Sequence, residues 1–175
     1  MSLTIIKYNA GNIQSVLYAL ERIGVSAIVT DDHDKIIKAD KVIFPGVGEA
    51  SSAMKYLRER KLDEVIKSLT QPVLGICLGM QLMCKYSEEN DTECLGIFDE
   101  EVKRFNPPSG AMGKVPQIGW NNIYDLRSEL FNGVDEKSYC YFVHGYAATL
   151  GEHTIATTDY IQPYSSGLHK NNFYG

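Results

Sequence analysis

The stretch PVLGICLGMQ, residues 72–81, decides the fold. Its first half is an apolar run typical of a buried strand, and a helical pattern from Met80 to about Tyr86 follows. Between them stands Gly75-Ile76-Cys77-Leu78-Gly79, in which a glycine lies two residues from the cysteine on each side. This is the spacing of a G-x-nucleophile-x-G turn, with Cys in the place often taken by Ser. We therefore predict a tight strand-to-helix turn with Cys77 at its tip.

The glycines around Cys77 have a physical task. A residue at such a tip has a strained backbone, and side chains on its neighbours would collide with adjoining elements. The turn places the sulfur at the carboxyl edge of a sheet and at a helix N-terminus, whose dipole favours a thiolate. It also presents the N–H of Leu78 to a developing oxyanion. A buried cysteine at an ordinary strand–helix junction fits this lone motif about equally well.

The chain before this turn alternates between strand and helix patterns. The predicted strands are residues 3–8, 25–30, 41–44 and 72–76, and the predicted helices begin at Ile13 and cover 34–39 and 52–69. In the first helix, apolar residues at helical spacing predict one buried face made of Val16, Leu17, Leu20 and Ile23. Asn12 is placed as its N-cap and Gly24 as its C-terminal cap.

The second half of the chain is rich in strands. They are expected at residues 95–105, 117–122, 139–144 and 154–158, with a short helix at 128–131. No linker, low-complexity tract or internal repeat interrupts the 175 residues, which predicts one domain over residues 1–175. The fold class expected is α/β, with a mostly parallel central sheet flanked by helices and additional antiparallel strands in the second half.

Composition excludes several classes of protein. A net charge of −5 argues against a large nucleic-acid interface, and no run of about 18 apolar residues predicts a membrane helix. The start of the chain does not resemble a signal peptide, so we expect a cytoplasmic protein whose four cysteines are free thiols. None of them forms a C-x-x-C pair, and we expect no metal and no cofactor; Cys84, Cys94 and Cys140 are best interpreted as structural.

Two further stretches attract attention. Pro45-Gly46-Val47-Gly48 follows a predicted strand, and its glycines permit close approach to a ligand, although an ordinary turn is slightly favoured for the loop alone. His144 ends a strand in Phe142-Val143-His144, where a satisfied strand-end histidine is slightly favoured over a pocket residue. The remaining histidines are expected outside any catalytic site, with His33 and His153 in solvated loops and His169 on a terminal hairpin.

These stretches together resemble the class I, or triad, glutamine amidotransferases, and most of all the glutaminase subunits of imidazole glycerol phosphate synthases. The resemblance rests on five blocks in family order that span nearly the whole chain. They are YNAGN at 8–12, FPGVG at 44–48, GICLGMQL at 75–82, VPQIGWN at 115–121 and YFVH at 141–144. The cysteine turn alone identifies only the superfamily, whereas the last two blocks select the subfamily.

The resemblance implies a role for each matching position. Cys77 would attack the side-chain amide of L-glutamine to form a thioester and release ammonia. The Leu78 N–H and the Gly46–Val47 peptide would form the oxyanion hole. The residues implied in substrate binding are Gly48, Gln81, Gly145 and Tyr146. The family usually has Ser where this chain has Gly145, which removes one hydrogen bond if the contact is made through a hydroxyl.

The resemblance also implies a partner. It would be the cyclase (synthase) subunit of imidazole glycerol phosphate synthase, joined as a heterodimer, which uses the ammonia. Asn12, Ser15 and Trp120 match positions near the docking face, although a core position for Trp120 is about as compatible with the sequence. The family's base and orienting acid belong to a Phe-His-Pro-Glu block, and no such block occurs here. Since the hairpin around Asn171-Asn172 has barely begun its second strand at Gly175, we expect a C-terminal segment to be missing and the chain as given to be nearly inactive.

Two alternatives stay open at this stage. A PfpI-like cysteine peptidase or hydrolase also has a cysteine turn on a similar fold, but the loop at 45–48 and the block at 115–121 favour the glutaminase. A non-catalytic binding or regulatory module is the second alternative. It predicts no glutaminase activity even in the presence of a partner.

Overall fold

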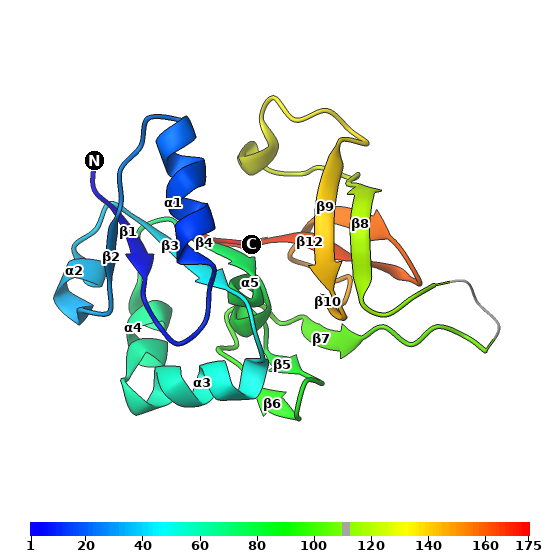
Figure 1. Ribbon diagram of the computed structural model, residues 1–175, viewed down its shortest axis with the longest axis horizontal. Coiled ribbons are helices and arrows are strands. Elements are labelled where there is room, and N and C mark those ends of the chain that lie inside the picture. The colour runs from blue at the N-terminus through cyan, green and yellow to red at the C-terminus, as the bar shows by residue number, and fades with distance from the viewer. Residues whose placement is uncertain (110–112) are drawn as a thin grey trace.

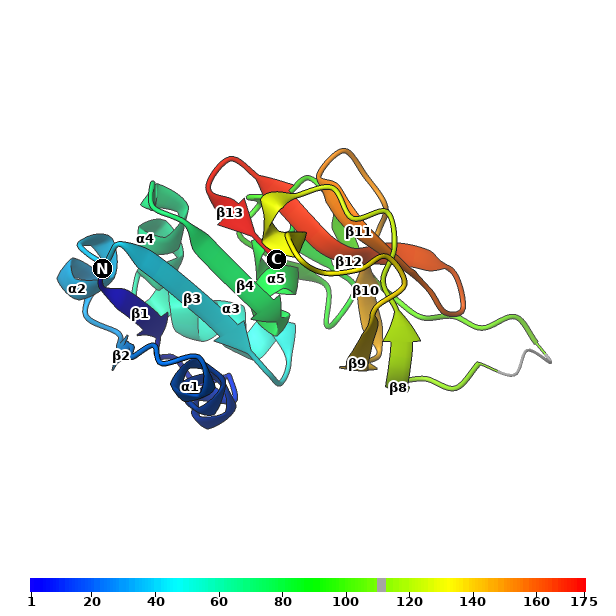
Figure 2. The same cartoon turned by 90° about the horizontal axis from the view of Figure 1, so that it is seen from above.

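Four parallel strands form the sheet of the first half in the computed structural model, which describes residues 1–109 and 113–175. They are β1 (Leu3–Ile6), β2 (Ile28–Thr30), β3 (Lys41–Gly46) and β4 (Val73–Cys77), in the order β2-β1-β3-β4. Figure 1 shows them at one end of the molecule, with antiparallel strands at the other end. The carboxyl ends of β3 and β4 point toward the antiparallel half (Figure 2), so any site at that edge lies between the two halves.

The sheet continues from β4 into the second half of the chain. Strand β13 (Phe173–Tyr174) pairs parallel with β4 and antiparallel with β12 (Pro163–Lys170). Further strands follow β12 in the order β10 (Tyr146–Ala148), β7 (Glu101–Arg104), β5 (Tyr86–Ser87) and β6 (Thr92–Glu93), while β11 (Thr154–Asp159) pairs with β12. A separate antiparallel ladder consists of β8 (Gln117–Asn122) and β9 (Tyr139–His144). The expected α/β fold class is confirmed.

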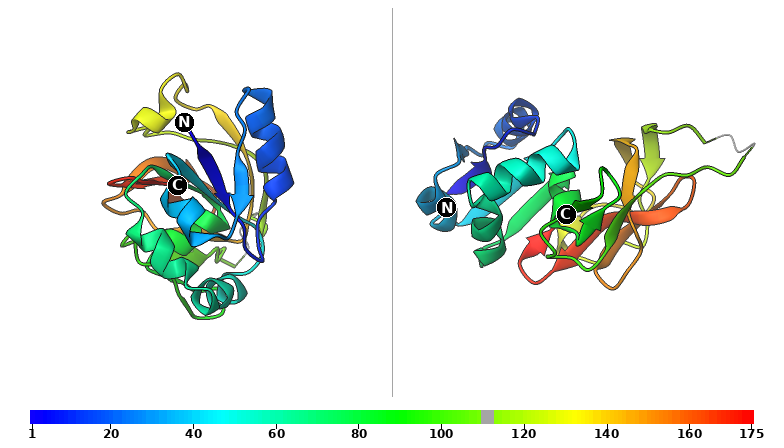
Figure 3. Two further views of the ribbon diagram at one scale, coloured as in Figure 1. Left: turned by 90° about the vertical axis from the view of Figure 1, so that its left-hand side faces the viewer. Right: turned by 90° about the horizontal axis from the view of Figure 1, so that it is seen from below.

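The helices pack on both faces of the parallel strands, as Figure 3 shows for α1 on one side and α3 and α4 on the other. The helices are α1 (Ile13–Arg22), α2 (His33–Ile37), α3 (Ala50–Glu59), α4 (Leu62–Ser68) and α5 (Leu78–Met83), with a short 3-10 helix at Glu129–Phe131. Within the described ranges, none of these helices has the length and apolar character needed to span a membrane.

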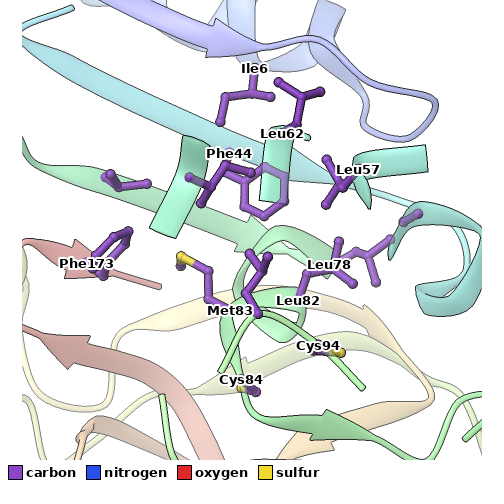
Figure 4. Packing of buried hydrophobic residues seen from close by; sticks show 14 of the residues in the cluster. Ile6, Phe44, Leu57, Leu62, Leu78, Leu82, Met83, Cys84, Cys94 and Phe173 are labelled. Atoms are coloured by element: carbon purple, nitrogen blue, oxygen red, sulfur yellow. The ribbon is translucent and has the colours of Figure 1, made fainter. Parts of the chain in front are cut away.

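The main core lies between the parallel strands and the α3–α5 side of the sheet (Figure 4). Phe44, Leu57, Leu62 and Leu82 are fully buried there, and each such side chain contributes about 1.5–3 kcal/mol of hydrophobic free energy. By contrast, no residue of α1 is fully buried. The core therefore fixes β3, β4 and α5 firmly, and these are the elements that meet at the cysteine turn.

The predicted caps of α1 are confirmed, but its predicted apolar face is only partly so. The Asn12 side chain accepts a hydrogen bond from the Ser15 N–H at 3.2 Å, and Gly24 follows the helix with φ of +72°. Ile23, however, is 71% exposed. Its prediction as a buried residue is wrong because the helix ends at Arg22, which leaves Ile23 at the C-cap and outside the apolar face.

The single helix predicted over residues 52–69 is wrong. The structure has two helices, α3 and α4, separated at Lys61, whose φ of +54° is left-handed. No glycine or proline marks this break in the sequence. The change of direction buries Leu57 and Leu62 on either side of it, and this tertiary packing outweighs the helical propensity of the segment.

The predicted helix from Met80 to Tyr86 and the predicted strand at residues 95–105 are both too long. Helix α5 ends at Met83, and only Glu101–Arg104 forms a strand. The reason is a long-range cap, because three consecutive N–H groups of the segment 95–97 donate to the last carbonyls of the α5 region. These bonds are Leu95 N to Leu82 O (2.8 Å), Gly96 N to Cys84 O (2.9 Å) and Ile97 N to Met83 O (2.9 Å). Leu95 and Phe98 are thus buried in a segment that caps a helix and not in a strand ladder.

Replacing Lys61 with Gly is expected to stabilise the protein by about 0.5 kcal/mol. Relief of the left-handed strain, about 1–2 kcal/mol, exceeds the added entropy of the unfolded glycine chain. The same change at Lys55, an exposed position inside α3, should destabilise by about 1 kcal/mol. Urea unfolding followed by circular dichroism measures both, and a destabilised Lys61→Gly variant would contradict the assigned strain.

Candidate active site

Cys77 lies at the junction of β4 and α5 with φ of +56° and ψ of −116°. A non-glycine residue in this region of backbone space is strained and persists only where the surrounding structure imposes it. The predicted turn with Cys77 at its tip is therefore confirmed in its geometry. The residue is exposed to solvent, as a reactive position requires.

Three glycines allow the elements around Cys77 to come into contact. A Cβ on Gly79 would lie 1.8 Å from the Phe44 carbonyl oxygen, which no side chain can occupy. A Cβ on Gly75 would meet Met80 N at 2.9 Å, and one on Gly46 would meet Gly79 N at 2.5 Å. The expectation that side chains at the flanking glycines would collide is correct. A side chain at Gly46, on the neighbouring strand β3, would collide as well.

The residues expected to form the oxyanion hole lie together. In the β3–β4 ladder Gly46 is paired with Cys77, so the loop after β3 lies beside the turn after β4. Leu78 follows Cys77 directly as the first residue of α5, and its N–H is close enough to the Cys77 sulfur to lower the pKa of the thiol. Val47 is half exposed and lines the same cavity as Cys77 and Leu78. Two strand ends thus bring backbone N–H groups to one place.

A cavity of about 430 Å³ opens in front of Cys77. It contains all four residues expected to bind substrate, together with residues from β9 and one acidic side chain. The lining is Val47, Gly48, Cys77, Leu78, Gln81, Glu89, Tyr141, Val143, His144, Gly145 and Tyr146. Its size suits a small amino-acid substrate, and its walls come from both halves of the molecule.

Gln81 is buried and joins the two sides of this cavity. Its Nε2 donates a hydrogen bond to the Tyr146 carbonyl oxygen at 2.9 Å. Because a carbonyl can only accept, the amide nitrogen is oriented toward Tyr146, and Gln81 Oε1 is left as a hydrogen-bond acceptor. Helix α5 is thereby fixed to the start of β10.

Glu89 is a cavity residue that sequence reasoning missed. One carboxylate oxygen, Oε2, accepts a hydrogen bond from the Ala50 N–H at 2.8 Å, and burial raises the pKa of the carboxyl group. Glu89 is the acidic side chain in the lining of this cavity, which faces Cys77 and Gln81. It stands in an ordinary acidic stretch at residues 88–91, and only the folded chain brings it to the site.

His144 is partly buried in an aromatic environment, and each of its ring nitrogens lies within hydrogen-bond distance of an oxygen. Nδ1 faces the Tyr146 carbonyl at 2.7 Å and therefore carries the proton, while Nε2 lies 3.2 Å from the Tyr164 hydroxyl. Burial lowers the pKa of His144, so the ring is neutral at pH 7. The sequence interpretation as a satisfied strand-end histidine is correct, although the residue also lines the cavity.

At the start of α5 the Leu78 N–H favours a thiolate at Cys77, but desolvation has the larger effect on the pKa of the thiol. Although the residue as a whole reaches solvent, the residues around its sulfur desolvate the thiol, which raises the pKa of Cys77 above its usual value. Helix α5 has only six residues, so its dipole is short. The thiol is protonated at neutral pH and needs a proton acceptor before it can act as a nucleophile.

The other cysteines and histidines lie away from this chemistry. Cys84 and Cys94 are buried, as expected of structural thiols, and Cys140 is partly buried. His153 is not solvated as expected, because its Nδ1 lies 3.1 Å from a carboxylate oxygen of the buried Glu100. Across residues 1–109 and 113–175, no group of three His, Cys, Asp or Glu side chains is arranged to hold a metal ion.

The positions expected near a partner lie on one side of the molecule. Figure 2 and Figure 3 show α1 and the β8–β9 ladder projecting to the same side. Asn12 and Ser15 form the first turn of α1, and Trp120 lies on β8. Trp120 is 68% exposed, so it lies on the surface, and the alternative of a core position is excluded.

The fold and the site define a class of protein, and comparison with known proteins agrees. The family model described as "Glutamine amidotransferase class-I" matches residues 4–175. A solved structure of a glutamine amidotransferase superposes with a TM-score of 0.73 at 16% identity, covering 99% of this chain and 87% of that chain, which shows the shared fold. The chain therefore belongs to the class I glutamine amidotransferase family of enzymes.

Curated relatives within this family carry one particular name. "Imidazole glycerol phosphate synthase subunit HisH" of Bacteroides fragilis is 58% identical over 174 residues, covering 99% of this chain and 88% of the relative. The protein of the same name from Haemophilus influenzae is 44% identical, covering the whole chain and 87% of the relative. The resemblance inferred from the five sequence blocks is confirmed.

The raised pKa of the thiol predicts how Cys77 alkylation depends on pH. A raised pKa means that the thiolate fraction is small at neutral pH and grows as the pH increases. The rate of iodoacetamide alkylation at Cys77 in residues 1–175 should therefore still be rising at pH 9. Peptide mapping by mass spectrometry measures it separately from Cys140, and a rate that levels off below pH 8 would show that the pKa is not raised.

Proposed function

We propose that the protein is the glutaminase subunit of an imidazole glycerol phosphate synthase. It hydrolyses L-glutamine to glutamate and ammonia through a thioester on Cys77 and passes the ammonia to a cyclase partner in histidine biosynthesis. The observation that carries the proposal is the single cavity in which Cys77 meets Leu78, Gln81 and Tyr146. The name shared by relatives at 44% and 58% identity supports the particular reaction. A single domain over residues 1–175 and a cytoplasmic location stay predictions.

Substrate recognition is proposed to rest on two acceptors and on backbone groups. The α-ammonium group of glutamine carries three donors, and the Glu89 carboxylate and Gln81 Oε1 are acceptors in the lining of the same cavity. Backbone around Gly48, Gly145 and Tyr146 would contact the remaining polar atoms. A contact through backbone makes the side chain at position 145 dispensable, so glycine there is compatible with binding.

The chemical step follows from the geometry of the turn. The Cys77 sulfur, once deprotonated, forms a bond with the side-chain amide carbon of glutamine, and the carbonyl π electrons move to the oxygen. The N–H groups of Leu78 and Val47 would stabilise that oxyanion, a type of contact worth about 10²–10³ in rate. Collapse of the intermediate breaks the C–N bond, and the nitrogen leaves as ammonia after gaining a proton. Water then hydrolyses the thioester to glutamate.

The base for this step is not proposed among the four histidines of the chain. Both nitrogens of His144 are engaged by Tyr146 and Tyr164, and His153 is bound to Glu100. The family resemblance implies that the base and its orienting acid belong to a Phe-His-Pro-Glu block, and residues 1–175 do not contain this block. The raised pKa of Cys77 agrees with a thiol that depends on such a base.

The proposed partner surface is the outer face of the β8–β9 ladder. Alternation along two paired strands places five large apolar side chains there, namely Ile118, Trp120, Tyr139, Tyr141 and Val143, each more than half exposed. Trp120 and Tyr141 contact each other edge to face, with ring centroids 5.4 Å apart. Tyr141 and Val143 also line the cavity of Cys77. A partner bound on this face would therefore adjoin the place where ammonia is released, which limits its loss to solvent.

Replacing Cys77 with Ala tests the nucleophile. In the complete enzyme with its synthase partner, glutamine-dependent turnover should fall by at least 10³-fold, because covalent catalysis is lost. Synthesis from added ammonia should remain, since it bypasses this site. Loss of both activities would point to a structural role for Cys77.

An active-site label that mimics glutamine, a diazoketone, should modify Cys77 in the wild type. An enzyme that leaves glutamine intact even with a partner would instead support a non-catalytic module.

Replacing Trp120 with Ala tests the docking face. Buried aromatic anchors in interfaces typically contribute about 2 kcal/mol or more, so the Kd for the synthase partner should rise at least about 30-fold. Ile28→Ala is the matched control, because Ile28 is also more than half exposed but lies on the edge strand β2. Isothermal titration calorimetry measures both variants, and an unchanged Kd for Trp120→Ala would exclude this face.

A further inference from the structure

Tyr8 follows β1 closely and has no part in the chemistry described above. It is buried, with 7% of its surface exposed, and its ring packs beside that of Phe44 with centroids 5.3 Å apart. Its hydroxyl donates a hydrogen bond to the Pro45 carbonyl oxygen at 2.7 Å. The connection between β1 and α1 is therefore attached to the end of β3 by a buried polar contact.

The Tyr8 hydroxyl lies where β3 meets the first turn of α5. A Cβ on Gly46 would be 2.7 Å from Tyr8 Oη and 2.5 Å from Gly79 N. Burial raises the pKa of Tyr8, and a charge on Cys77 raises it further, which agrees with a neutral hydroxyl close to the nucleophile. Since its proton is directed to Pro45, this hydroxyl acts on the loop and not on the sulfur.

The Pro45–Gly48 loop is less closely packed directly after this contact. Val47 is half exposed, and Gly48 has φ of +112° with no atom within 4 Å of the position of a Cβ. The Gly46–Val47 peptide thus lies between Pro45, which the Tyr8 hydroxyl holds, and Gly48, which has open space at the position of a Cβ. A rotation of the Pro45–Gly46 segment would turn the Val47 N–H, so the direction of that donor depends on how firmly Pro45 is held.

We infer that Tyr8 is a positioning residue for the oxyanion hole. Its hydroxyl holds the Pro45 carbonyl so that the Val47 N–H is directed to the space in front of the Cys77 sulfur. The inference rests on the proposed function, because it assumes that an oxyanion forms there. A purely structural role would assign the importance of Tyr8 to its ring. Tyr8→Phe separates the two, since it keeps the ring and removes only the donor.

The test compares two reactions of Cys77 in the complete enzyme with its synthase partner. Glutamine hydrolysis passes through a tetrahedral oxyanion, whereas alkylation by iodoacetamide does not. For Tyr8→Phe we expect kcat for glutamine to fall about tenfold, a part of the 10²–10³ typical of losing an oxyanion donor. The KM for glutamine should stay within about twofold, and the alkylation rate should not change.

Thr158→Val is the matched control. Thr158 is fully buried in β11, and its hydroxyl donates to the Asn122 carbonyl oxygen at 3.0 Å, so the variant loses the same kind of bond elsewhere. Both reactions should be unchanged in it. A kcat for Tyr8→Phe equal to that of the wild type would overturn the inference, and so would an equal loss in alkylation, which would indicate a disturbed turn. A wild-type enzyme that does not hydrolyse glutamine would overturn the proposed function itself.

Discussion

The contact between the Phe44 carbonyl and Gly79 is the constraint on which the site depends. There is no space for a side chain at Gly79, because a Cβ would lie 1.8 Å from the carbonyl oxygen. The close approach brings the first turn of α5 against the end of β3, and the buried side chains of Phe44 and Leu82 hold both elements in the core. Cys77, between the two, is left with a positive φ that the surrounding packing maintains. A strained nucleophile and a neighbouring loop that lines the same cavity are thus two consequences of one steric contact.

The Tyr146 carbonyl joins the parallel half of the molecule to the antiparallel half. It accepts hydrogen bonds from Gln81 on α5 and from His144 on β9. Each donor has its orientation fixed by this acceptor, because a carbonyl oxygen cannot donate in return. The cavity in front of Cys77 is therefore built from two halves whose relative position is set by buried polar contacts as well as by the sheet. Such networks are costly to disturb, which suits a site that must hold a small substrate closely.

The β8–β9 ladder separates two tasks by the alternation of its side chains. Residues that point outward, such as Trp120 and Tyr141, form an exposed apolar face. Residues that point inward, Gln117 and His144, belong to a partly buried network around the Tyr164 hydroxyl, whose oxygen lies 3.2 Å from His144 Nε2 and 3.0 Å from Gln117 Oε1. A period of two residues makes this division unavoidable in any strand with one buried face. The exposed apolar face and the inner network are consequently only one residue apart in sequence, and Tyr141 of the exposed face also reaches the cavity of Cys77.

The sequence by itself determined the turn at Cys77, the loop at Pro45–Gly48 and the alternation of strands and helices, because each depends on neighbours in the chain. Glycines two residues from a cysteine, an apolar run before it and a helical period after it are local signals, and the family resemblance followed from such blocks. Only the tertiary structure decided the break at Lys61, the capping of α5 by residues 95–97, the exposure of Trp120 and the places of Tyr8 and Glu89. These depend on contacts between residues far apart in sequence, such as Tyr8 with Pro45 or Ala50 with Glu89. The raised pKa of Cys77 was also decided by the tertiary structure. Desolvation of the thiol comes from the residues packed around it, and the sequence of a helix start does not reveal it.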